Sequence, residues 1–436
     1  MGQIFKFCNP ENMVFERGYY TIISRNLEEY LYTKKEIKNY NLLIVYEIPE
    51  IFILQIYGDK KNVLQFYHDT KFLISESQSI VNLNTLSSNQ ESMPHSKKIQ
   101  WDIKKITRNY KTHSMCTGSH EYCVALIDSG IDINHPDLKD NILSKVNMVP
   151  KNGFRGQEED ENGHPDYMID KLNHGTQVAG QICGKGNITS VAPNLGIRVY
   201  RIFGGKSADN VWIMKAIIKA ANDGVDVINL SLGSYIIREP HKKNGEYLPN
   251  RNLEIQGFQK AIDYAEQKGV IVVGALGNDN INIDNREEFL NYIVEKDKIT
   301  EFSPSSTILD LPSQLNNVIG VASANANNQL ASYSNYSENN IDILAYAGDT
   351  TLLDKYGKDY WLNNQLIMDD WVLTTSQEGS HMFSTGNSLA SGKVAASIAV
   401  MNQYFNINKN PELTRHILGK QDSSILNLYD LLHTKF

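Results

Sequence analysis

The central part of the chain alternates strand-like apolar runs with stretches of helical periodicity. Runs rich in β-branched and other apolar residues occur at 122–128, 194–203, 225–234 and 270–274, while 210–223 and 257–268 repeat apolar residues with helical spacing. Continuous apolar strands separated by helices are typical of a parallel sheet buried between helices. The pattern predicts an α/β fold, a three-layer α/β/α arrangement with a mostly parallel sheet, whose functional groups lie at the carboxyl ends of strands.

The first 80 residues follow a different pattern. Strand-like runs at 19–24, 41–48 and 51–57 alternate with a helix-like run at 27–33, which predicts a small α+β domain at 1–80. The stretch 81–98 is polar and has little periodicity, so it predicts an exposed linker. The remainder, 99–436, is expected to be a second, larger domain. A chain of 436 residues exceeds what one core usually organises, which agrees with this division.

Charge and hydropathy exclude several classes of partner. Lysine and arginine number 42 against 50 acidic residues, and no long basic block occurs, so nucleic acid is not expected as a partner. No apolar run is long enough for a membrane span. The first ten residues lack the apolar core of a signal peptide, which predicts a cytoplasmic protein, or an extracellular one if an export signal has been removed.

Cysteines and acidic residues give no metal site. Cys8, Cys116, Cys123 and Cys183 are too few and too scattered for a disulfide scaffold, so free thiols are expected, although Cys116 and Cys123 could close a short loop in an oxidising compartment. No CxxC or HExxH motif occurs, and neither a metal nor a cofactor is expected. The acidic run 158–164 lacks the ligand spacing of calcium loops and is interpreted as a solvated face.

One serine stands where a small-residue turn meets an apolar, helix-forming stretch. The sequence FSTGNSLASGKVAASIAVM at 383–401 places Ser388 at this joint. Unpaired backbone N–H groups and the positive end of the helix dipole stabilise negative charge at such a position. A serine is a weak nucleophile without a base, so a histidine and a carboxylate are required elsewhere.

Both partners occur earlier in the chain. Asp128 ends the apolar run at 122–128 and is followed by a glycine turn, which places it at the carboxyl end of a strand. His174 follows a polar residue and opens a segment of helical periodicity. The order Asp, His, Ser is that of subtilisin, whereas chymotrypsin and the α/β-hydrolases use other orders.

These three stretches resemble the signature motifs of the subtilisin-like serine proteases. A fourth stretch, GVIVVGALGN at 269–278, resembles the strand and turn that end in the oxyanion-hole asparagine of that family. The resemblance implies that Ser388 attacks, that His174 is general base and then acid, and that Asp128 orients the imidazole. It also implies that Asn278 binds the oxyanion; in subtilisin, loss of this donor lowers turnover by about 10²–10³.

The resemblance extends to the cleft and implies its walls. Ser231, Leu232 and Gly233 correspond to the segment that pairs with the substrate backbone and forms one wall of the pocket for the residue before the cut. Ala275, Leu276 and Gly277 would form the opposite wall. The alternative is that Ser231 and Gly233 are only turn formers.

Three features depart from the usual family pattern. Asn387 stands where threonine is usual and is expected to support the oxyanion, and Gly392 replaces a proline. The interval from His174 to Pro193 is shorter than in calcium-binding subtilisins. Asp137 is therefore not expected to belong to a tight calcium site.

Within this family, the chain is most similar to the lantibiotic leader peptidases. The segments 146–156, 170–176, 200–204, 211–217 and 371–375 carry this resemblance, which covers most of 99–410. It implies removal of a leader peptide from a modified lanthipeptide precursor, and an N-terminal propeptide. Because the stretch 87–95 is polar and extended enough to enter the cleft, we expect the chain to cut itself there. The long connections at 235–255 and 279–312 border the cleft and are expected to add selectivity.

Two other functions remain open at this point. A general degradative or maturation subtilase would share the same catalytic motifs but cut peptides broadly. A non-catalytic binding protein on this fold would usually lack a triad residue, and all three are present. For residues 1–80, the alternative to a propeptide is a domain that binds another partner.

Overall fold

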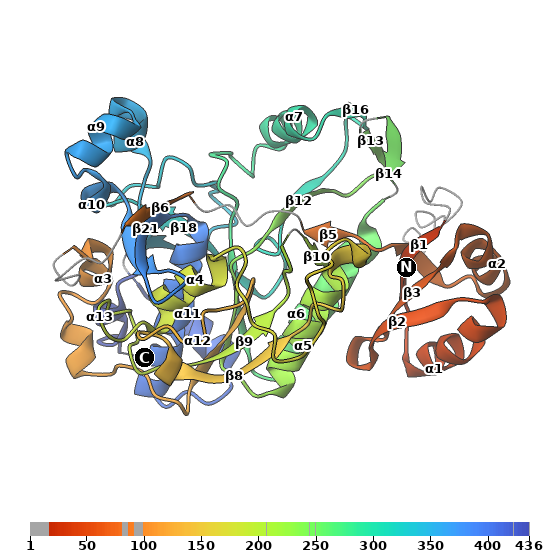
Figure 1. The fold of residues 1–436 in the computed structure, drawn as a ribbon, viewed down its shortest axis with the longest axis horizontal. Coiled ribbons are helices and arrows are strands. Elements are labelled where there is room, and N and C mark those ends of the chain that lie inside the picture. Colours follow the sequence, from red (N-terminus) through yellow and green to blue (C-terminus); the bar gives the residue numbers. More distant parts are fainter. Residues whose placement is uncertain are drawn as a thin grey trace.

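The computed structural model describes residues 17–80, 86–90, 99–205, 207–243, 245–248, 250–421 and 423–435. Figure 1 shows a large α/β body and, beside it, a smaller unit formed by the first part of the chain. The smaller unit lies against helices α5 (Asn210–Asn222) and α6 (Asn252–Gln267) of the body.

The body is built on a seven-stranded sheet in which every neighbouring pair of strands is parallel. The strands are nearly all buried because helices cover both faces. In spatial order they are β19 (Ile343–Tyr346), β18 (Val318–Ala324), β15 (Ile271–Ala275), β11 (Val227–Leu230), β7 (Cys123–Asp128), β9 (Gly196–Arg201) and β8 (Ile142–Asn147).

Each face of the sheet has its own apolar core. Helices α5 and α6 pack on one face, where the side chains of β7, β11 and β15 meet theirs. The other face is covered by α3 (Trp101–Ile106), α4 (His174–Cys183), α11 (Asn387–Tyr404), α12 (Pro411–Leu418) and α13 (Leu428–Leu431). The predicted three-layer α/β/α fold with a parallel sheet is confirmed.

The smaller unit is an antiparallel sheet with helices. Its strands lie in the order β2 (Leu43–Ile48), β3 (Ile53–Asp59), β1 (Arg17–Ile23) and β4 (Leu73–Glu76), and its helices are α1 (Leu27–Glu36) and α2 (Lys60–Thr70). Short 3-10 turns at Ile37–Tyr40 and Pro49–Ile51 flank β2. A separate apolar core that includes Tyr20, Leu54 and Phe66 holds the unit together.

Specific polar contacts join the smaller unit to the body. The Gln55 Nε2 amide donates a hydrogen bond of 2.9 Å to Asp209 Oδ2, just before α5, and Lys260 Nζ of α6 donates to the Ser24 carbonyl at 3.2 Å. The rings of Tyr46 and Trp212 lie 6.3 Å apart at the same interface.

Two short strands then carry the chain across the body. Strand β5 (Ser79–Ile80) pairs antiparallel with β10 (Ala208–Asp209), directly before α5. Strand β6 (Leu86–Gln90) pairs antiparallel with β21 (His381–Thr385), which also pairs with β20 (Val372–Thr375). Part of the predicted linker is therefore a strand, while 81–85 and 91–98 lie outside the described residues.

The two long connections fold into a small lobe instead of open loops. Strand β12 (Ser234–Ile237) pairs with β17 (Ile308–Leu311), and β13 (His241–Lys243) pairs with β14 (Glu246–Leu248) and β16 (Ile299–Glu301). Helix α7 (Arg286–Lys296) packs on them through Phe289, Leu290 and Ile293. Figure 1 places this lobe along one margin of the body.

A second peripheral group consists of α8 (Thr351–Tyr356), α9 (Lys358–Asn363) and α10 (Ile367–Asp370), held around the buried Trp361 and Trp371. Among the residues that the structure describes, no helix is both long and apolar enough to cross a membrane. Cys116, Cys123 and Cys183 are free thiols, and Cys183 is completely buried.

Candidate active site

The structure brings Asp128 and His174 into direct contact. Asp128 is the last residue of β7 and His174 is the first residue of α4, so a strand end and a helix start meet at this point. His174 Nδ1 lies 2.7 Å from Asp128 Oδ1. The two side chains are almost completely buried, which strengthens the electrostatic interaction between them.

Hydrogen bonds from Ser129 fix the orientation of the Asp128 carboxylate. The Ser129 backbone N–H donates to Asp128 Oδ1 at 2.7 Å, and the Ser129 hydroxyl donates to Asp170 Oδ1 at 2.6 Å. Asp170 also accepts hydrogen bonds from the backbone and hydroxyl of Thr176 on α4. Burial and the charge of Asp128 raise the pKa of Asp170. Asp170 therefore ties the aspartate strand to the histidine helix.

The environment of His174 favours its protonated form. Burial alone lowers the pKa of this imidazole, but the charge and hydrogen bond of Asp128 outweigh it, so the pKa of His174 is raised above its ordinary 6.5. An imidazole that binds a proton more strongly is a better general base.

Ser388 is the second residue of α11 and 5% exposed. Its hydroxyl donates to the Ser231 carbonyl oxygen at 3.2 Å, while His174 Nε2 has no hydrogen-bond partner within the part of the chain that the structure describes. The base is thus unoccupied on the side where it would take a proton. Catalytic hydrogen bonds often form fully only in the substrate complex.

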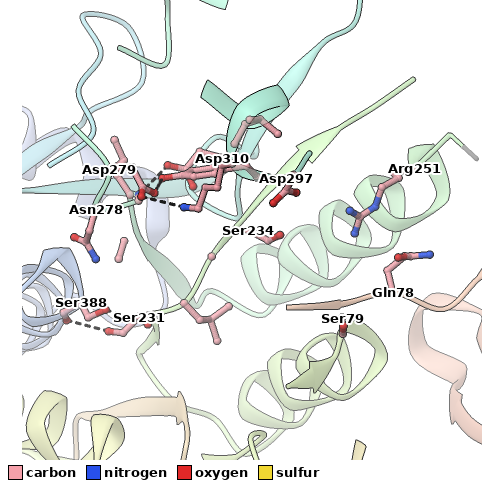
Figure 2. Close-up of a pocket in the computed structure, with 18 of the residues that line it drawn as sticks. Gln78, Ser79, Ser231, Ser234, Arg251, Asn278, Asp279, Asp297, Asp310 and Ser388 are labelled. Atoms are coloured by element: carbon pink, nitrogen blue, oxygen red, sulfur yellow. Dashed lines mark hydrogen bonds and ion pairs between the residues drawn. The ribbon is translucent and has the colours of Figure 1, made fainter. Parts of the chain in front are cut away.

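Asn278 follows β15 and points toward the start of α11 (Figure 2). Its side-chain oxygen accepts a hydrogen bond of 2.9 Å from the Asn387 backbone N–H, which fixes the amide beside Ser388. A fixed amide and the first N–H groups of a helix are the donors that an oxyanion requires.

The side chain of Asn387 has a different position from the one expected. Its amide donates to the carbonyl oxygens of Leu276 and Gly277, at 3.2 and 2.8 Å, and its oxygen accepts from the Ser334 hydroxyl. The expectation that this side chain supports the oxyanion is therefore corrected. Asn387 instead holds one wall of the adjoining pocket.

A cavity of about 420 Å³ opens at Ser388 between the two expected walls (Figure 2). Ser231, Leu232 and Gly233 line one side, and Ala275, Leu276 and Gly277 line the other. Residues of the small lobe complete the cavity, and Gln78 and Ser79, which follow the smaller unit in the chain, also line it. The structure thus places all six expected wall residues around one pocket.

Among the described residues that line this pocket, the charged side chains are paired, with one exception. Lys296 contacts Asp279 at 3.0 Å, Lys243 contacts Asp297 at 2.9 Å and Arg251 pairs with Glu254. Asp310 is 1% exposed, accepts from the Gly277 N–H at 2.8 Å through Oδ2, and leaves Oδ1 without a hydrogen bond among the described residues.

Burial raises the pKa of Asp310 to about 7, despite the Gly277 hydrogen bond that opposes the shift. This carboxyl was not identified from the sequence because no motif surrounds it. Its role depends on β17 pairing with β12, which places Asp310 opposite Tyr235.

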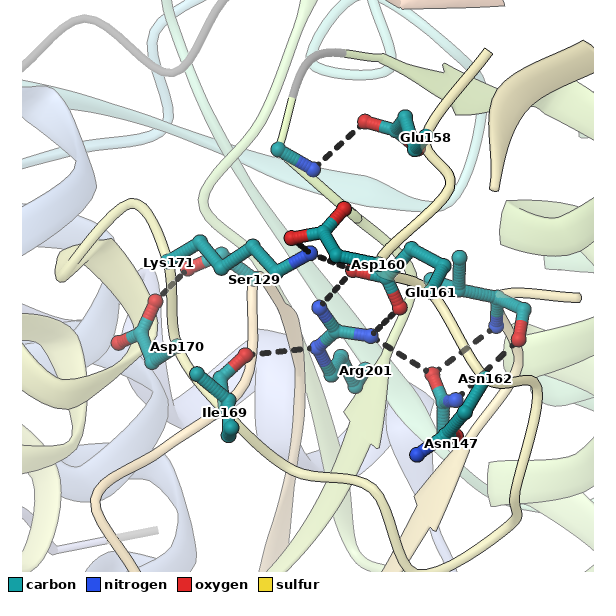
Figure 3. Close-up of polar contacts among 12 residues, drawn as sticks. Ser129, Asn147, Glu158, Asp160, Glu161, Asn162, Ile169, Asp170, Lys171 and Arg201 are labelled. Carbon is teal, nitrogen blue, oxygen red and sulfur yellow. Dashed lines mark hydrogen bonds and ion pairs between the residues drawn. The ribbon is translucent and has the colours of Figure 1, made fainter. Parts of the chain in front are cut away.

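A buried ionic network supports the loop before His174 (Figure 3). Arg201 makes two bonds of 2.8 Å to Glu161, and its Nε donates to the Ile169 carbonyl at 2.9 Å. Lys171 pairs with both Asp160 and Glu161. The interpretation of 158–164 as a solvated face was wrong for Glu158 and Glu161, which are buried. Periodicity alone could not show that Arg201, on β9, needed partners.

Asp137 is engaged by protein donors. The backbone N–H groups of Asn187 and Ile188 donate to its two oxygens at 3.1 and 2.9 Å, and His381 Nε2 lies 2.8 Å from Oδ2. These donors and the charge of His381 lower the pKa of Asp137 although burial acts in the opposite direction. Asp137, which is not expected to belong to a tight calcium site, here joins β21 to the segment after α4.

Comparison with known proteins agrees with this geometry. The sequence profile of the Subtilase family matches residues 119–427. The chain is 37% identical to the epidermin leader peptide-processing serine protease of Staphylococcus epidermidis, over 93% of this chain and 88% of that protein. It is 35% identical to the nisin leader peptide-processing serine protease of Lactococcus lactis subsp. lactis over 77% of this chain, which spans 49% of that longer protein.

A solved structure shows the same arrangement of elements. The crystal structure of the epidermin leader peptide processing serine protease from Staphylococcus aureus superposes with a TM-score of 0.85 at 30% identity, over 96% of this chain and 99% of that one. The similarity therefore includes the smaller N-terminal unit as well as the α/β body.

Proposed function

Since the chain belongs to the subtilase family of serine proteases, we propose that it is the endopeptidase that removes the leader peptide from a modified lanthipeptide precursor. The observation that carries this proposal is the similarity to the epidermin leader peptidase along 93% of the chain, at 37% identity. A general degradative subtilase would share the triad, so the triad alone does not separate the two functions.

The geometry supports acyl transfer through a covalent intermediate. Ser388 Oγ attacks the carbonyl carbon before the cut while its proton passes to His174 Nε2, and Asp128 stabilises the imidazolium that forms. Asn278 and a backbone N–H group near Ser388 stabilise the negative charge on the carbonyl oxygen.

His174 then returns the proton to the departing amine, and the C-terminal peptide leaves. Water hydrolyses the resulting acyl-enzyme with the same histidine as base.

The smaller N-terminal unit fits the role of a propeptide. Strand β5 pairs beside the pocket and β6 pairs with the strand that leads into Ser388, so the chain is held on both sides of the nucleophile. A partner-binding domain would not require this placement of β5 and β6.

A dedicated enzyme must discriminate between substrates, and the pocket beside Ser388 has additional structure that could do so. The lobe built from the two long connections contributes Tyr235, Lys243, Lys296 and Asp310 to the pocket lining. Main-chain pairing accepts most sequences, so side-chain pockets of this kind decide which bond is cut.

The test compares modified lanthipeptide precursors, each with its own leader, with casein and unrelated peptides. We expect one class of leader junction to be cut at least tenfold faster than the other substrates, since pocket contacts typically change discrimination by about 10–200-fold. The Ser388→Ala variant is the control and should cut none of them. Similar rates across the panel would favour the degradative alternative.

A further inference from the structure

A second groove lies beside the catalytic pair and takes no part in the reaction described above. It has a volume of about 830 Å³ and is formed by three segments: 131–136 after the catalytic aspartate, 166–170 before the catalytic histidine, and the turn 377–379 between β20 and β21. The groove therefore adjoins the elements that hold Asp128 and His174.

Its surface combines aliphatic side chains with negative charge. Ile133 and Ile169 are 37% and 55% exposed, although most large apolar residues of the body are buried. Asp132, Asp166 and Glu378 add carboxylates, and none of the described residues that line the groove is basic. A peptide with aliphatic and cationic side chains complements such a surface.

Among the described residues, ion pairs with these carboxylates are few and long. The two oxygens of Asp132 accept hydrogen bonds from the neutral backbone N–H groups of Asn134 and Gly379. Asp166 has long contacts of 3.7 Å with Lys145 and 3.9 Å with His164, and its side chain is 69% exposed. Glu378 is exposed on the turn. A cation in the groove would therefore find negative charge that internal ion pairs have not neutralised.

The groove is continuous with the path of the chain beyond the nucleophile. Along β6, Leu86 lies opposite Thr385 and Gln90 lies opposite His381. Because β21 runs from His381 toward Ser388, a strand in this register moves away from Ser388 as it proceeds and reaches the turn at 376–380. That turn forms one side of the groove.

We infer that this groove binds the part of the substrate that follows the cut, and that it selects segments carrying both aliphatic and lysine or arginine side chains. Under the proposed function, on which this inference rests, that part is the modified core peptide released by cleavage. The enzyme then binds its precursor on both sides of the cleaved peptide bond, with the leader terminus in the pocket and the core peptide in the groove.

The experiment starts from the peptide of the substrate panel that is cut fastest. A shortened version of it, which ends three residues after the cleaved bond, is the reference. It is compared with two versions extended by eight residues, one alternating isoleucine and lysine and the other alternating isoleucine and glutamate. We expect the lysine extension to be cut about fivefold more efficiently than the glutamate extension, mainly through KM, since a few exposed charge pairs each contribute modestly. The difference should shrink at 1 M salt because exposed charges are screened.

Charge reversal in the groove supplies the matched comparison. In Asp166→Lys with Glu378→Lys, the preference for the lysine extension should disappear, with each rate expressed relative to the short peptide cut by the same variant. Asp140→Lys, an exposed carboxylate outside the groove, should retain it. Equal rates for the two extensions in the wild type, or an unchanged preference in the double variant, would overturn the inference. Because any cleaved peptide can serve as the reference, these outcomes are separate from failure of the leader-peptidase proposal.

Discussion

His174 is the residue whose ionisation sets the working pH of the site. Its Nε2 accepts the proton of Ser388 only when the imidazole is neutral, and Asp128 raises the pKa of His174 above 6.5. We therefore expect kcat/KM to fall as pH decreases, with a midpoint above about 6.5. The measurement is a rate profile from pH 5 to 9 with an apolar residue before the cut, so that Asp310 does not influence it.

Asp128→Asn is the control for this profile. It should lower kcat by about 10⁴, as the equivalent change does in another Ser-His-Asp protease, and move the midpoint down because the imidazolium loses its partner charge. A wild-type midpoint at or below the ordinary histidine value would contradict the raised pKa.

Asp310 is the residue expected to decide which side chain is accepted before the cut. Its Oδ1 lacks a hydrogen bond among the described residues while the nearby lysines are already paired. Lysine, arginine and glutamine can donate to this oxygen, so peptides carrying them should be cut faster than those with leucine or glutamate. Since the pKa of Asp310 is raised to about 7, its charge increases between pH 6 and 8, and the preference for lysine over glutamine should increase with it.

The matched variant is Asp310→Asn, which keeps the shape and removes the charge. Losing one well-placed contact should reduce the preference for lysine by about 10-fold or more. An unchanged ratio of lysine to leucine cleavage in this variant would assign selectivity to other parts of the lobe.

At this scale, the sequence identified residues that stand in recognisable motifs. Asp128, His174, Ser388 and Asn278 each lie near the end of a strand or the start of a helix, and the structure gathers them at one edge of the sheet. Asp170, Asp310 and the side-chain position of Asn387 were not foreseen. Their roles depend on which segments become neighbours in space, and local patterns do not contain that information.

The strands β5 and β6 are the elements that determine where the chain would cut itself. An acyl-enzyme retains the segment upstream of the cut, which corresponds to β5, and releases the segment downstream, which corresponds to β6. We therefore expect the cut after Ile80 and upstream of Leu86, earlier than the range 87–95 expected from the sequence. Mass spectrometry of the wild type beside Ser388→Ala measures it.

In that measurement Ser388→Ala should remain full length, because it lacks the nucleophile. A new N-terminus within 91–95, or a single full-length mass for both proteins, would show that the two strands do not mark the two sides of the cleavage position.

The contact between β21 and Asp137 is an element-scale reason to expect calcium independence. Both oxygens of Asp137 already bind protein donors, two of them backbone N–H groups that cannot move without disrupting the chain after α4. Addition of a chelator should leave the melting temperature unchanged, since only an ion bound to the native state would stabilise it by mass action. A clear decrease would reveal a calcium site elsewhere.

Four strands of the seven-stranded sheet could be predicted because their periodicity is strong. Strands β7, β9, β11 and β15 and helix α5 agree with the predicted runs within a few residues, whereas α6 begins five residues before the expected Gly257. The lobe, α2 and the strands β8, β18 and β19 were missed. Strands of three or four residues, such as β13 and β16, carry too little pattern to be recognised, and their pairing joins segments more than 50 residues apart.

On the scale of the whole molecule, a buried ion pair joins the first helix of the body to the helix of the nucleophile. Lys393 Nζ lies 2.6 Å from Asp102 Oδ2, both side chains are fully buried, and burial lowers the pKa of Lys393. Lys393→Met leaves Asp102 without its partner, so we expect a loss of about 3–5 kcal/mol of stability. Thermal melting in the Ser388→Ala background, which prevents self-digestion, measures the loss.

Replacing both partners, as Lys393→Met with Asp102→Leu, is the control. An apolar pair of similar volume should recover most of the stability, since the cost of the single change comes from the unpaired charge. A double variant as unstable as the sum of both single changes would indicate that Asp102 and Lys393 do not act as a pair.

The placement of β5 and β6 also determines how the segment between them and a free substrate compete for the cleft. A segment tethered to the protease occupies the cleft at an effective concentration in the millimolar range, whereas a free precursor at micromolar concentration meets the cleft rarely. Onset of activity would then be a first-order event whose half-time does not change on dilution. Each molecule would become active independently of the others. It would stay inactive until its own N-terminal segment leaves the cleft.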